Sequence, residues 1–302
     1  MKVLICDAVA EDAVKMMQSA GHEVTVKTGM TPEELVAEVP GYEVAIVRSA
    51  TKFRQPAIDA GTSLKLIMRG GVGIDNIDAD YAREKGILVW NTPAASSAGV
   101  AELAIGLMFA VSRHICRADI STKKGKWEKK LFKGNELGGK VLGIIGLGRI
   151  GTEVAKRAKG LGMSVVGFDP LVEECDYARM VTFDRLLADS DIITLHLPHT
   201  KDTHHIISGP EFEKMKKDVI LINVARGGVV NEEALVRALE SGKVGRAAVD
   251  VFEVEPMDPK NPLTKFDNVI LTPHIGASSV ESQGRIGYEL VDKLERFVKG
   301  NY

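Results

Sequence analysis

Short apolar runs alternate along the chain with longer segments in which apolar and polar residues mix. This alternation is typical of βαβ units, in which helices cover a parallel sheet. Mixed segments such as Glu11–Ser19 and Pro32–Val39 predict amphipathic helices. Thr31, with Pro32 after it and Glu34 three residues on, predicts an N-cap and a capping box. Five apolar runs in the first third are expected to form strands: Val3–Cys6, Glu23–Val26, Val44–Val47, Leu64–Met68 and Ile87–Val89.

The alternation is interrupted once and then resumes. Residues 91–99 are small, polar and turn-rich, and the long apolar run Val100–Val111 predicts a buried helix. A basic stretch that contains glycine follows, at Arg113–Lys140. The second alternating series predicts six more strands: Val141–Ile145, Ser164–Phe168, Ile192–Leu197, Val219–Asn223, Ala247–Val251 and Val269–Leu271.

The last predicted helix, at about Ser279–Val298, comes after the second series is complete, and we expect it to pack back on the first series. With 302 residues, the chain is also long for one domain. We therefore expect an α/β fold with two doubly wound parallel sheets. Residues 96–279 would form a domain inserted into a discontinuous domain made of residues 1–95 and 280–302. The crossings, near residues 92–98 and 276–284, are expected to form a hinge.

A glycine-rich turn follows the first strand of the second series. Gly146, Gly148 and Gly151 make a GxGxxG pattern directly after Val141–Ile145, and a helical segment comes next. In dinucleotide-binding folds the first glycine allows the tight turn, the second lets the pyrophosphate approach the backbone, and the third lets the helix pack on the strand. The helix N-terminus then offers N–H groups and partial positive charge to the phosphates. The turn therefore predicts a dinucleotide site.

An acidic residue indicates which dinucleotide binds. Asp169 ends the next strand, Ser164–Phe168, at the position where a carboxylate can accept hydrogen bonds from the ribose hydroxyls of the adenosine. The same carboxylate would repel the 2′-phosphate of NADP, and the three residues after it supply no arginine. The sequence therefore favours NAD over NADP.

Three polar residues follow later strands of the second series. Arg226 lies in NVARGG, Glu255 in DVFEVEP, and His274 in LTPHIGAS. Ligands of doubly wound sheets bind beyond the carboxyl ends of the strands, so these positions suit an active site. Alcohol oxidation needs a base, which histidine supplies, a carboxylate to orient it, and a guanidinium to bind a carboxylate substrate. Each residue alone could be structural, and it is their combination after a dinucleotide turn that favours catalysis.

The order of these motifs resembles the D-2-hydroxyacid dehydrogenase family. The match extends into the first series, through Val47–Thr51 and Met68–Asn76, and covers nearly the whole chain. Gly125–Lys130 (GKWEKK) and the NELGGK segment also resemble the phosphoglycerate dehydrogenase branch. The resemblance implies a Rossmann NAD-binding domain inserted into a discontinuous, flavodoxin-like substrate domain. It also implies a homodimer formed through residues 98–140.

The resemblance implies roles for single residues. Arg226 would bind and activate the substrate, His274 would be the acid–base group, and Glu255 would be its partner. Asp250 would face the carboxamide of the nicotinamide. The cofactor-binding positions that it implies, with the glycine turn, are Gly146, Gly148, Arg149, Ile150, Gly151, Asp169, Val224, Ala225, Arg226, Asp250, His274, Gly276 and Ala277.

Substrate-binding candidates lie in the first series. The turn that starts at Gly70 and Gly71 could offer N–H groups to the substrate carboxylate, although a purely structural turn would look the same. Arg48, beside Ser49, and Arg69 end two strands and could bind a phosphate. In the phosphoglycerate branch these positions bind the phosphate end. The implied reaction is NAD-dependent oxidation of 3-phospho-D-glycerate to 3-phosphooxypyruvate, the first step of serine biosynthesis.

Two alternatives stay open. The chain stops at Tyr302, which leads us to expect no serine-binding regulatory domain, and this short form also resembles hydroxypyruvate and glyoxylate reductases. An alternative of another class is an NAD-sensing, corepressor-like interaction protein, because a fold does not by itself fix a function.

The amino-acid composition limits the classes of binding partner that we expect. Lysine and arginine number 39 and aspartate and glutamate 41, which gives a net charge of −2, so we expect no nucleic-acid or membrane partner. The three cysteines are far apart, and no signal peptide or membrane-spanning run is visible, so we expect a cytoplasmic protein. Four histidines crowd into one segment after a strand: His196, His199, His204 and His205. We interpret that segment as a loop beside the cofactor, and we expect no metal.

Overall fold

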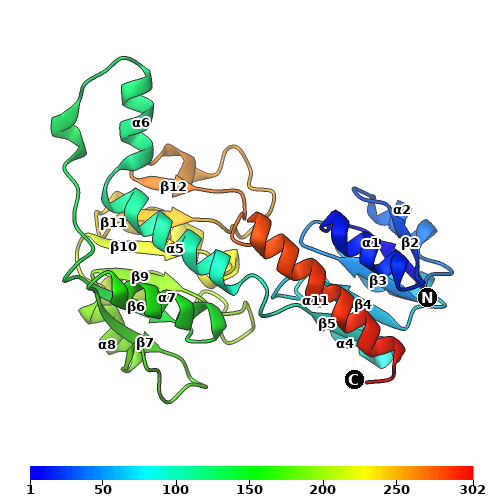
Figure 1. The fold of residues 1–302 in the computed structure, drawn as a ribbon. Coiled ribbons are helices and arrows are strands. Elements are labelled where there is room, and N and C mark those ends of the chain that lie inside the picture. The colour runs from blue at the N-terminus through cyan, green and yellow to red at the C-terminus, as the bar shows by residue number, and fades with distance from the viewer. Residues whose placement is uncertain (302) are drawn as a thin grey trace. The chain divides into compact units, whose positions relative to one another are not determined.

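The computed structural model describes residues 1–301 and divides the chain into two compact units (Figure 1). Unit 1 is Met1–Ser97 together with the chain from Ala277 onward, and unit 2 is Ala98–Gly276. These crossings lie two or three residues from the expected ones, at 95/96 and 279/280. Each unit is built on its own parallel sheet with helices packed against it, which confirms the predicted fold class.

Unit 1 contains a five-stranded parallel sheet in the order β2-β1-β3-β4-β5, which is the flavodoxin-like order. Its core lies on both faces: Val3 and Ile5 pack on one side of β1, and Leu4 and Cys6 on the other. A sheet buried on both faces explains the unbroken apolar runs of the sequence. The strands are β1 (Lys2–Ile5), β2 (Glu23–Val26), β3 (Val44–Val47), β4 (Leu66–Arg69) and β5 (Leu88–Asn91).

The C-terminal helix of the chain belongs to the core of unit 1. Ile286, Leu290 and Leu294 are buried there with Met17 of the first helix. The predicted capping box at Thr31 is also present, since the Thr31 Oγ1 accepts from the Glu34 N–H and the Glu34 carboxylate accepts from the Thr31 N–H. The helices are α1 (Glu11–Ser19), α2 (Pro32–Glu38), α3 (Gln55–Ala60), α4 (Ala79–Glu84) and α11 (Val280–Val298).

Unit 2 contains a seven-stranded parallel sheet in the order β12-β11-β10-β9-β6-β7-β8. The strand order reverses between β6 and β9, which is the switch point at which Rossmann domains bind dinucleotides. The strands are β6 (Val141–Ile145), β7 (Ser164–Phe168), β8 (Arg179–Met180), β9 (Ile192–Leu195), β10 (Val219–Asn223), β11 (Val244–Val249) and β12 (Val269–Leu271).

Helices and single turns of 3-10 helix connect these strands. They are α6 (Ile115–Lys123), η1 (Lys129–Phe132), α7 (Arg149–Gly160), α8 (Phe183–Asp189), α9 (Gly209–Lys214), η2 (Gly227–Val229), α10 (Glu232–Glu240) and η3 (Pro262–Lys265). The predicted buried helix is α5 (Ser97–Ser112), and its apolar side chains pack into the core of unit 2. Within residues 1–301 no single helix could cross a membrane, and only α5 with α6, across a bend of 61°, has the length and composition.

One difference from the sequence-based expectation has a physical reason. The strand expected at Ala247–Val251 runs instead from Val244 to Val249, because the polar Arg246 at its amino end hides the start of the strand. The guanidinium of Arg246 donates to the Ser112 carbonyl and to the Asn135 Oδ1. The basic stretch after α5 contains α6 and η1, which stand away from the rest of unit 2 (Figure 1).

Candidate active site

The three glycines of the turn after β6 have different reasons to be glycine. Gly146 has a φ of +93°, and a Cβ there would lie 2.5 Å from the His196 carbonyl oxygen. A Cβ on Gly151 would overlap the Gly146 carbonyl. Gly148 has an ordinary φ of −67°, and a Cβ there would meet no atom within 4 Å. The folded chain therefore needs Gly146 and Gly151, whereas Gly148 keeps open a space that a pyrophosphate would fill.

Helix N–H groups and a carboxylate lie beside that space. Helix α7 begins at Arg149, and its N-cap, Gly148, supplies no side-chain acceptor for the first-turn N–H groups, which include that of Ile150. Asp169 follows β7, and its two oxygens accept from the Leu147 and Leu171 N–H groups, each at 2.8 Å. The carboxylate is thereby fixed beside the glycine turn. These residues fit a dinucleotide.

Asp250, directly after β11, organises the neighbouring loop. It is fully buried, and its carboxylate accepts from the Thr272 hydroxyl at 2.6 Å, the Ile275 N–H at 2.9 Å and the Gly276 N–H at 3.0 Å. Burial raises the pKa of Asp250, and these hydrogen bonds, with the nearby His274, oppose the rise. The contacts give Asp250 a positioning role, and its predicted contact with the nicotinamide stays a prediction.

His274 lies within this loop and is paired with Glu255. The His274 Nδ1 is 2.7 Å from the Glu255 Oε2, and the His274 N–H donates to the Asp250 carbonyl at 2.8 Å. His274 has a φ of +53°, in the left-handed region that non-glycine residues rarely adopt. A conformation of this kind persists only where surrounding contacts enforce it, and such positions cluster at functional sites.

The environment of Glu255 favours its ionised form. Burial alone would raise the pKa of Glu255, but the hydrogen bond and charge of His274 lower it more, helped by the Phe252 N–H and by the charge of Arg226. The net shift is downward, so the carboxylate beside His274 is charged at neutral pH. A charged partner of this kind orients a histidine and stabilises its protonated form.

Arg226 lies on the loop after β10, and the backbone shape of that loop is fixed. The Asn223 side chain donates to the Arg226 carbonyl at 3.0 Å and accepts from the Ala225 N–H at 3.1 Å. Val224 and Ala225 are buried. The next residue, Gly227, packs so closely that a Cβ would overlap the Phe252 carbonyl. The Arg226 loop and the Glu255 loop of unit 2 are therefore in direct contact.

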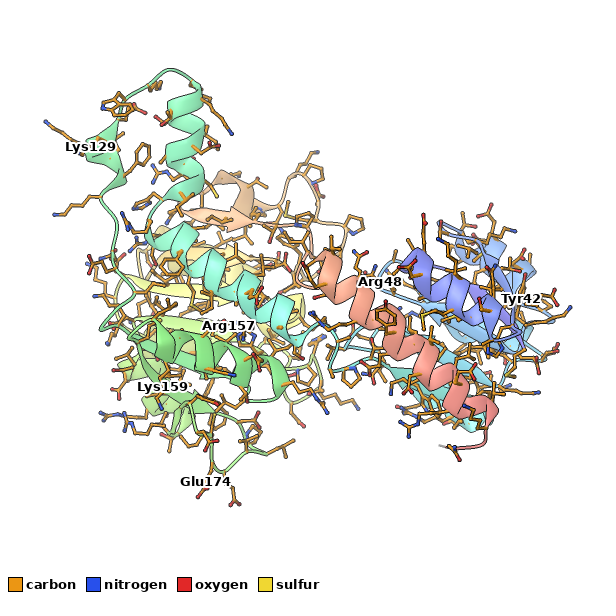
Figure 2. The ribbon with its side chains drawn as sticks, viewed as in Figure 1. Tyr42, Arg48, Lys129, Arg157, Lys159 and Glu174 are labelled. Atoms are coloured by element: carbon orange, nitrogen blue, oxygen red, sulfur yellow. The ribbon has the colours of Figure 1, made fainter. Side chains whose placement is uncertain are left out.

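In unit 1, Arg48 (labelled in Figure 2) and Ser49 follow β3, and a buried aspartate, Asp7, contacts the backbone of this segment. The Asp7 carboxylate accepts from the Arg48 N–H at 2.5 Å and from the Thr51 N–H at 3.1 Å. The Arg48 Nε is buried and has no hydrogen-bond partner among residues 1–301. Burial lowers the pKa of Arg48, and Asp7 opposes the shift. This guanidinium suits an anion.

The turn after β4 differs from the expectation in one respect. The Gly70 N–H donates to the Val47 carbonyl and the Gly71 N–H to the Arg69 carbonyl, so these two amides are already used within unit 1. Val72 and Gly73 come next, and their N–H groups donate to no acceptor within residues 1–301. Sequence reasoning identified the turn but not which of its amides are available. Arg69 is 8% exposed and packs over Gly71.

Comparisons with known proteins show which family the chain belongs to. The family model for the D-isomer specific 2-hydroxyacid dehydrogenase, NAD binding domain, matches residues 105–276. A D-3-phosphoglycerate dehydrogenase of Archaeoglobus fulgidus is 50% identical in an alignment of 304 positions, which covers 99% of this chain but 58% of that protein. A hydroxypyruvate reductase of Thermotoga maritima is 48% identical over 97% of both chains. The chain belongs to the D-2-hydroxyacid dehydrogenase family.

The solved structures include members of the same family. One is a D-lactate dehydrogenase of Aquifex aeolicus complexed with NAD and lactic acid, which is 33% identical and superposes with a TM-score of 0.87 over 99% of this chain and 96% of that one. The family model describes an NAD-binding domain, and it lies within unit 2, which carries the glycine turn. Of the predicted cofactor positions, only Ala277 falls in unit 1, where it packs against the core around α11.

The four histidines after β9 are not arranged as a metal site within the described part of the chain. Within residues 1–301, no group of three or more histidine, cysteine or acidic side chains is arranged to hold a metal ion. His196 is bonded through its Nε2 to the Thr194 hydroxyl, and burial lowers its pKa to about 3, so its ring is neutral. His204 contacts both His199 and His205.

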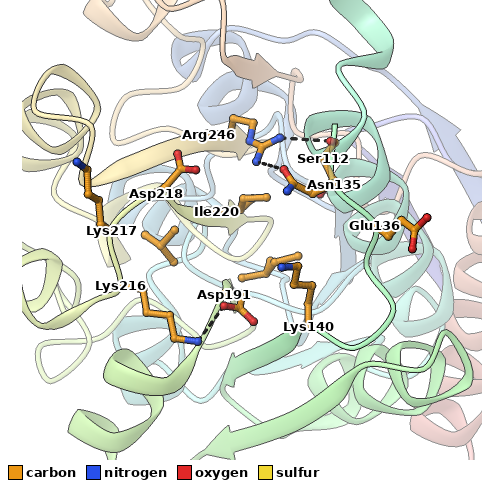
Figure 3. Close-up of a pocket in the computed structure, with 12 residues that line it drawn as sticks. Ser112, Asn135, Glu136, Lys140, Asp191, Lys216, Lys217, Asp218, Ile220 and Arg246 are labelled. Atoms are coloured by element: carbon orange, nitrogen blue, oxygen red, sulfur yellow. Dashed lines mark hydrogen bonds and ion pairs between the residues drawn. The ribbon is translucent and has the colours of Figure 1, made fainter. Parts of the chain in front are cut away.

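A pocket of about 190 Å³ lies at the opposite edge of the sheet of unit 2, where its strands begin (Figure 3). Lys140, Asp191 and Asp218 line it directly before β6, β9 and β10. Asp191 pairs with Lys216 at 2.8 Å. Because the strands are parallel, this edge is far along the sheet from the motifs, and the pocket is not the candidate site.

We predict opposite consequences for two glycine-to-alanine substitutions in the turn. Gly148→Ala should leave thermal unfolding unchanged but weaken NAD binding by about tenfold or more, because the new methyl group occupies the pyrophosphate space. Gly151→Ala should lower the unfolding free energy by roughly 1–3 kcal/mol, because its Cβ overlaps the Gly146 carbonyl. Thermal denaturation without ligand and calorimetric titration with NAD measure both. A Gly148→Ala protein that binds NAD as well as the parent would contradict the assignment.

We also predict a pH-dependent stabilisation by Glu255. Its pKa is lowered in the folded state from the ordinary 4.5, so its contribution is present above pH 4.5 and is lost as the pH falls through the folded pKa. The parent should therefore be more stable than Glu255→Gln near neutral pH, and the difference should shrink below pH 4.5. Urea unfolding between pH 3 and 7 (roughly the range in which the carboxylate titrates) measures this. Glu233→Gln, at an exposed carboxylate of α10, controls for loss of one charge.

Proposed function

We propose that the chain catalyses NAD-dependent oxidation of 3-phospho-D-glycerate to 3-phosphooxypyruvate, the first step of serine biosynthesis. The observation that carries the proposal is the 2.7 Å pair between His274 and Glu255, at the same strand edge as the open space over Gly148. This pair supplies a base held in place by a charged partner. The space supplies room for the pyrophosphate of a dinucleotide cofactor.

His274 acts as the base. Its Nδ1 donates to the Glu255 carboxylate, so in the neutral ring the Nε2 carries the lone pair that accepts the substrate hydroxyl proton. NAD, which the glycine turn and Asp169 would hold, would supply the acceptor for the hydride on the carbon that bears this hydroxyl, so that the alcohol would become a carbonyl. The ionised Glu255 stabilises the positive charge that His274 gains. The reverse reaction returns the proton from His274 to the carbonyl oxygen.

Two sets of groups support the choice of substrate and cofactor. Arg226 would bind the substrate carboxylate with two parallel hydrogen bonds and polarise the reacting oxygen. Arg69, which is buried, and Arg48, which is half-buried with a buried Nε, would bind the phosphate. The Asp169 carboxylate beside the turn favours NAD over NADP, whose additional phosphate it would repel.

One specific observation favours a second candidate, reduction of hydroxypyruvate or glyoxylate. The Thermotoga maritima relative is named a hydroxypyruvate reductase, and its similarity covers almost its whole length. Such a substrate has no phosphate. The chemistry at His274, Glu255 and Arg226 would be the same, so the two candidates differ only in how unit 1 binds the far end of the substrate.

We predict that a substrate panel separates the candidates. For phosphoglycerate dehydrogenase activity, kcat/KM should be higher for phosphorylated substrates, and Arg48→Ala should lower that value by tenfold or more while sparing unphosphorylated ones. The panel should pair 3-phosphoglycerate and D-glycerate with NAD and with NADP, and their keto acids with the reduced cofactors.

Two outcomes would contradict the proposal. Equal kcat/KM for phosphorylated and unphosphorylated substrates would favour the reductase. Absence of turnover with every pair, with NAD still bound, would favour an NAD-sensing interaction protein. His274→Ala serves as the control for chemistry, since losing an acid–base group should lower kcat by about 10²–10⁴.

We further propose that the chain forms a homodimer through residues 98–140. Four apolar side chains of α6, η1 and the turn between them are more than half exposed: Ile115, Ile120, Trp127 and Leu131. Trp127 is 86% exposed. Figure 2 labels Lys129 in the same segment, which stands away from the rest of unit 2. Exposed apolar groups gathered on one segment are typical of a protein–protein interface.

We predict that replacing Trp127 and Ile120 by aspartate produces a monomer, because buried charges would oppose association. Sedimentation velocity should show the parent as a dimer and the double variant at half its mass. Leu171→Asp, at a 91% exposed apolar residue outside the segment, is the matched control and should stay dimeric. Parent and variants with the same mass would show that this segment is not the interface.

A further inference from the structure

Three loops meet at one point of unit 2, and two of them carry proposed catalytic residues. The loop after β9 contains His205, whose N–H donates to the Gly228 carbonyl at 2.8 Å on the loop after β10. The loop after β10 carries Arg226 and packs through Gly227 against the backbone of Phe252, on the loop after β11. That third loop carries Glu255. The relative positions of Arg226 and Glu255 therefore depend on how these loops are joined.

Glu253 joins them. Its Oε1 accepts from the His205 Nε2 at 3.0 Å and from the Glu232 N–H, also at 3.0 Å, at the start of α10. In return, the Glu253 N–H donates to the Glu232 carboxylate at 2.7 Å. The Glu232 carboxylate also accepts from the Asn261 side chain at 2.9 Å. Carboxylates at a helix N-terminus are stabilised by the free N–H groups and dipole there, which strengthens this exchange.

The hydrogen bonds of Asn231 fix the orientation of the His205 ring. Asn231 is the N-cap of α10, and its Oδ1 accepts from the Ala234 N–H at 2.8 Å. Its NH₂ group must therefore face the His205 Nδ1, 3.2 Å away, and that nitrogen acts as the acceptor. The ring proton is then on Nε2, where it donates to Glu253. His204 stacks on the same ring, with centroids 3.8 Å apart, and contacts His199.

We propose that His205 and Glu253 are positioning residues for the reaction: together they hold the Arg226 loop and the Glu255 loop in register. The inference rests on the proposed dehydrogenase function. Glu253 is two residues from Glu255, and His205 is bonded to the backbone two residues from Arg226. Neither side chain contacts the His274 ring or the glycine turn in any hydrogen bond of residues 1–301. Their loss should therefore disturb chemistry and substrate binding but not NAD binding.

The decisive comparison uses two substitutions of His205. His205→Gln keeps an NH group near the position of Nε2 and can still donate to Glu253, whereas His205→Asn is too short to reach it. His205 has a φ of +51°, a conformation that asparagine adopts more readily than glutamine. Backbone strain alone therefore predicts that the asparagine variant is the better enzyme. The positioning role predicts the opposite order.

The expected results concern kcat, KM and the pH profile. Glu253→Ala and His205→Asn should lower kcat and raise the KM of the hydroxy acid, with kcat/KM down by tenfold or more, and should move the pH profile of kcat. His205→Gln should stay within about threefold of the parent, because the hydrogen bond to Glu253 remains. The Kd of NAD should be the same in the parent and in all three variants. Glu233→Ala is the matched control, because Glu233 follows Glu232 in α10 and its carboxylate is exposed.

Hydrogen exchange supplies a readout that does not depend on turnover. In Glu253→Ala the Glu232 amide, which loses its Glu253 acceptor, should exchange at least about tenfold faster than in the parent or in Glu233→Ala. The amides of residues 224–230 and 252–256 should also exchange faster, because the bonds that join His205 and Glu232 to the β11 loop are gone. The amides of residues 146–151 should be unchanged. Folding is checked by the melting temperature and by the unchanged Kd of NAD.

Failure of this inference can be told from failure of the proposed function. An active parent whose Glu253→Ala and His205→Asn variants keep kcat/KM and the pH profile would overturn the positioning role and leave the dehydrogenase proposal intact. An asparagine variant better than the glutamine variant would also overturn it. Absence of turnover in the parent would contradict the proposed function. Unchanged hydrogen exchange of both loops in Glu253→Ala would then contradict the positioning role as well.

Discussion

The buried carboxylate of Asp250 is the constraint on which the edge of unit 2 with the proposed catalytic residues depends. Removing a charge from water is costly unless it is fully hydrogen-bonded, and Asp250 meets that condition through Thr272, Ile275 and Gly276. All three donors lie on one short loop after β12. The carboxylate therefore fixes that loop to the end of β11, and with it the backbone of His274. Burial in turn raises the pKa of Asp250.

The same principle recurs one strand further into the sheet. Glu253 and Glu232 exchange backbone hydrogen bonds between the β11 loop and the start of α10, and His205 adds a bond from the β9 loop. Side-chain carboxylates that accept from backbone N–H groups set loop shape more firmly than surface ion pairs, which contribute little. The two networks act on different residues: Asp250 positions His274, and Glu253 positions the loops of Arg226 and Glu255.

The sequence predicts the strands of both units well, because a sheet buried on both faces produces continuous apolar runs. It also predicts Gly146, Asp169, Arg226, Glu255 and His274 at strand ends, since each follows such a run. The Glu253, His205 and Glu232 network lay outside this reasoning. Its hydrogen bonds join Glu253 to His205, 48 positions away in sequence, and to Glu232, 21 positions away. Contacts at such separations leave no periodic pattern in the sequence. His205 looked instead like part of a histidine cluster, and the signal that could have separated it was Asn231, an N-cap ahead of α10.

The sequence alone does not distinguish a glycine that the fold requires from a glycine that a ligand requires. Gly146, Gly151 and Gly227 are required by the chain itself, since a Cβ at each would strike a backbone carbonyl. Gly148 is not required in that way, and neither its φ nor its surroundings exclude a side chain. The fold would tolerate a side chain at Gly148 but not at Gly146 or Gly151, so the glycine at position 148 needs a different explanation. The explanation that fits the donors around it is a ligand that comes closer to the backbone than a methyl group would allow.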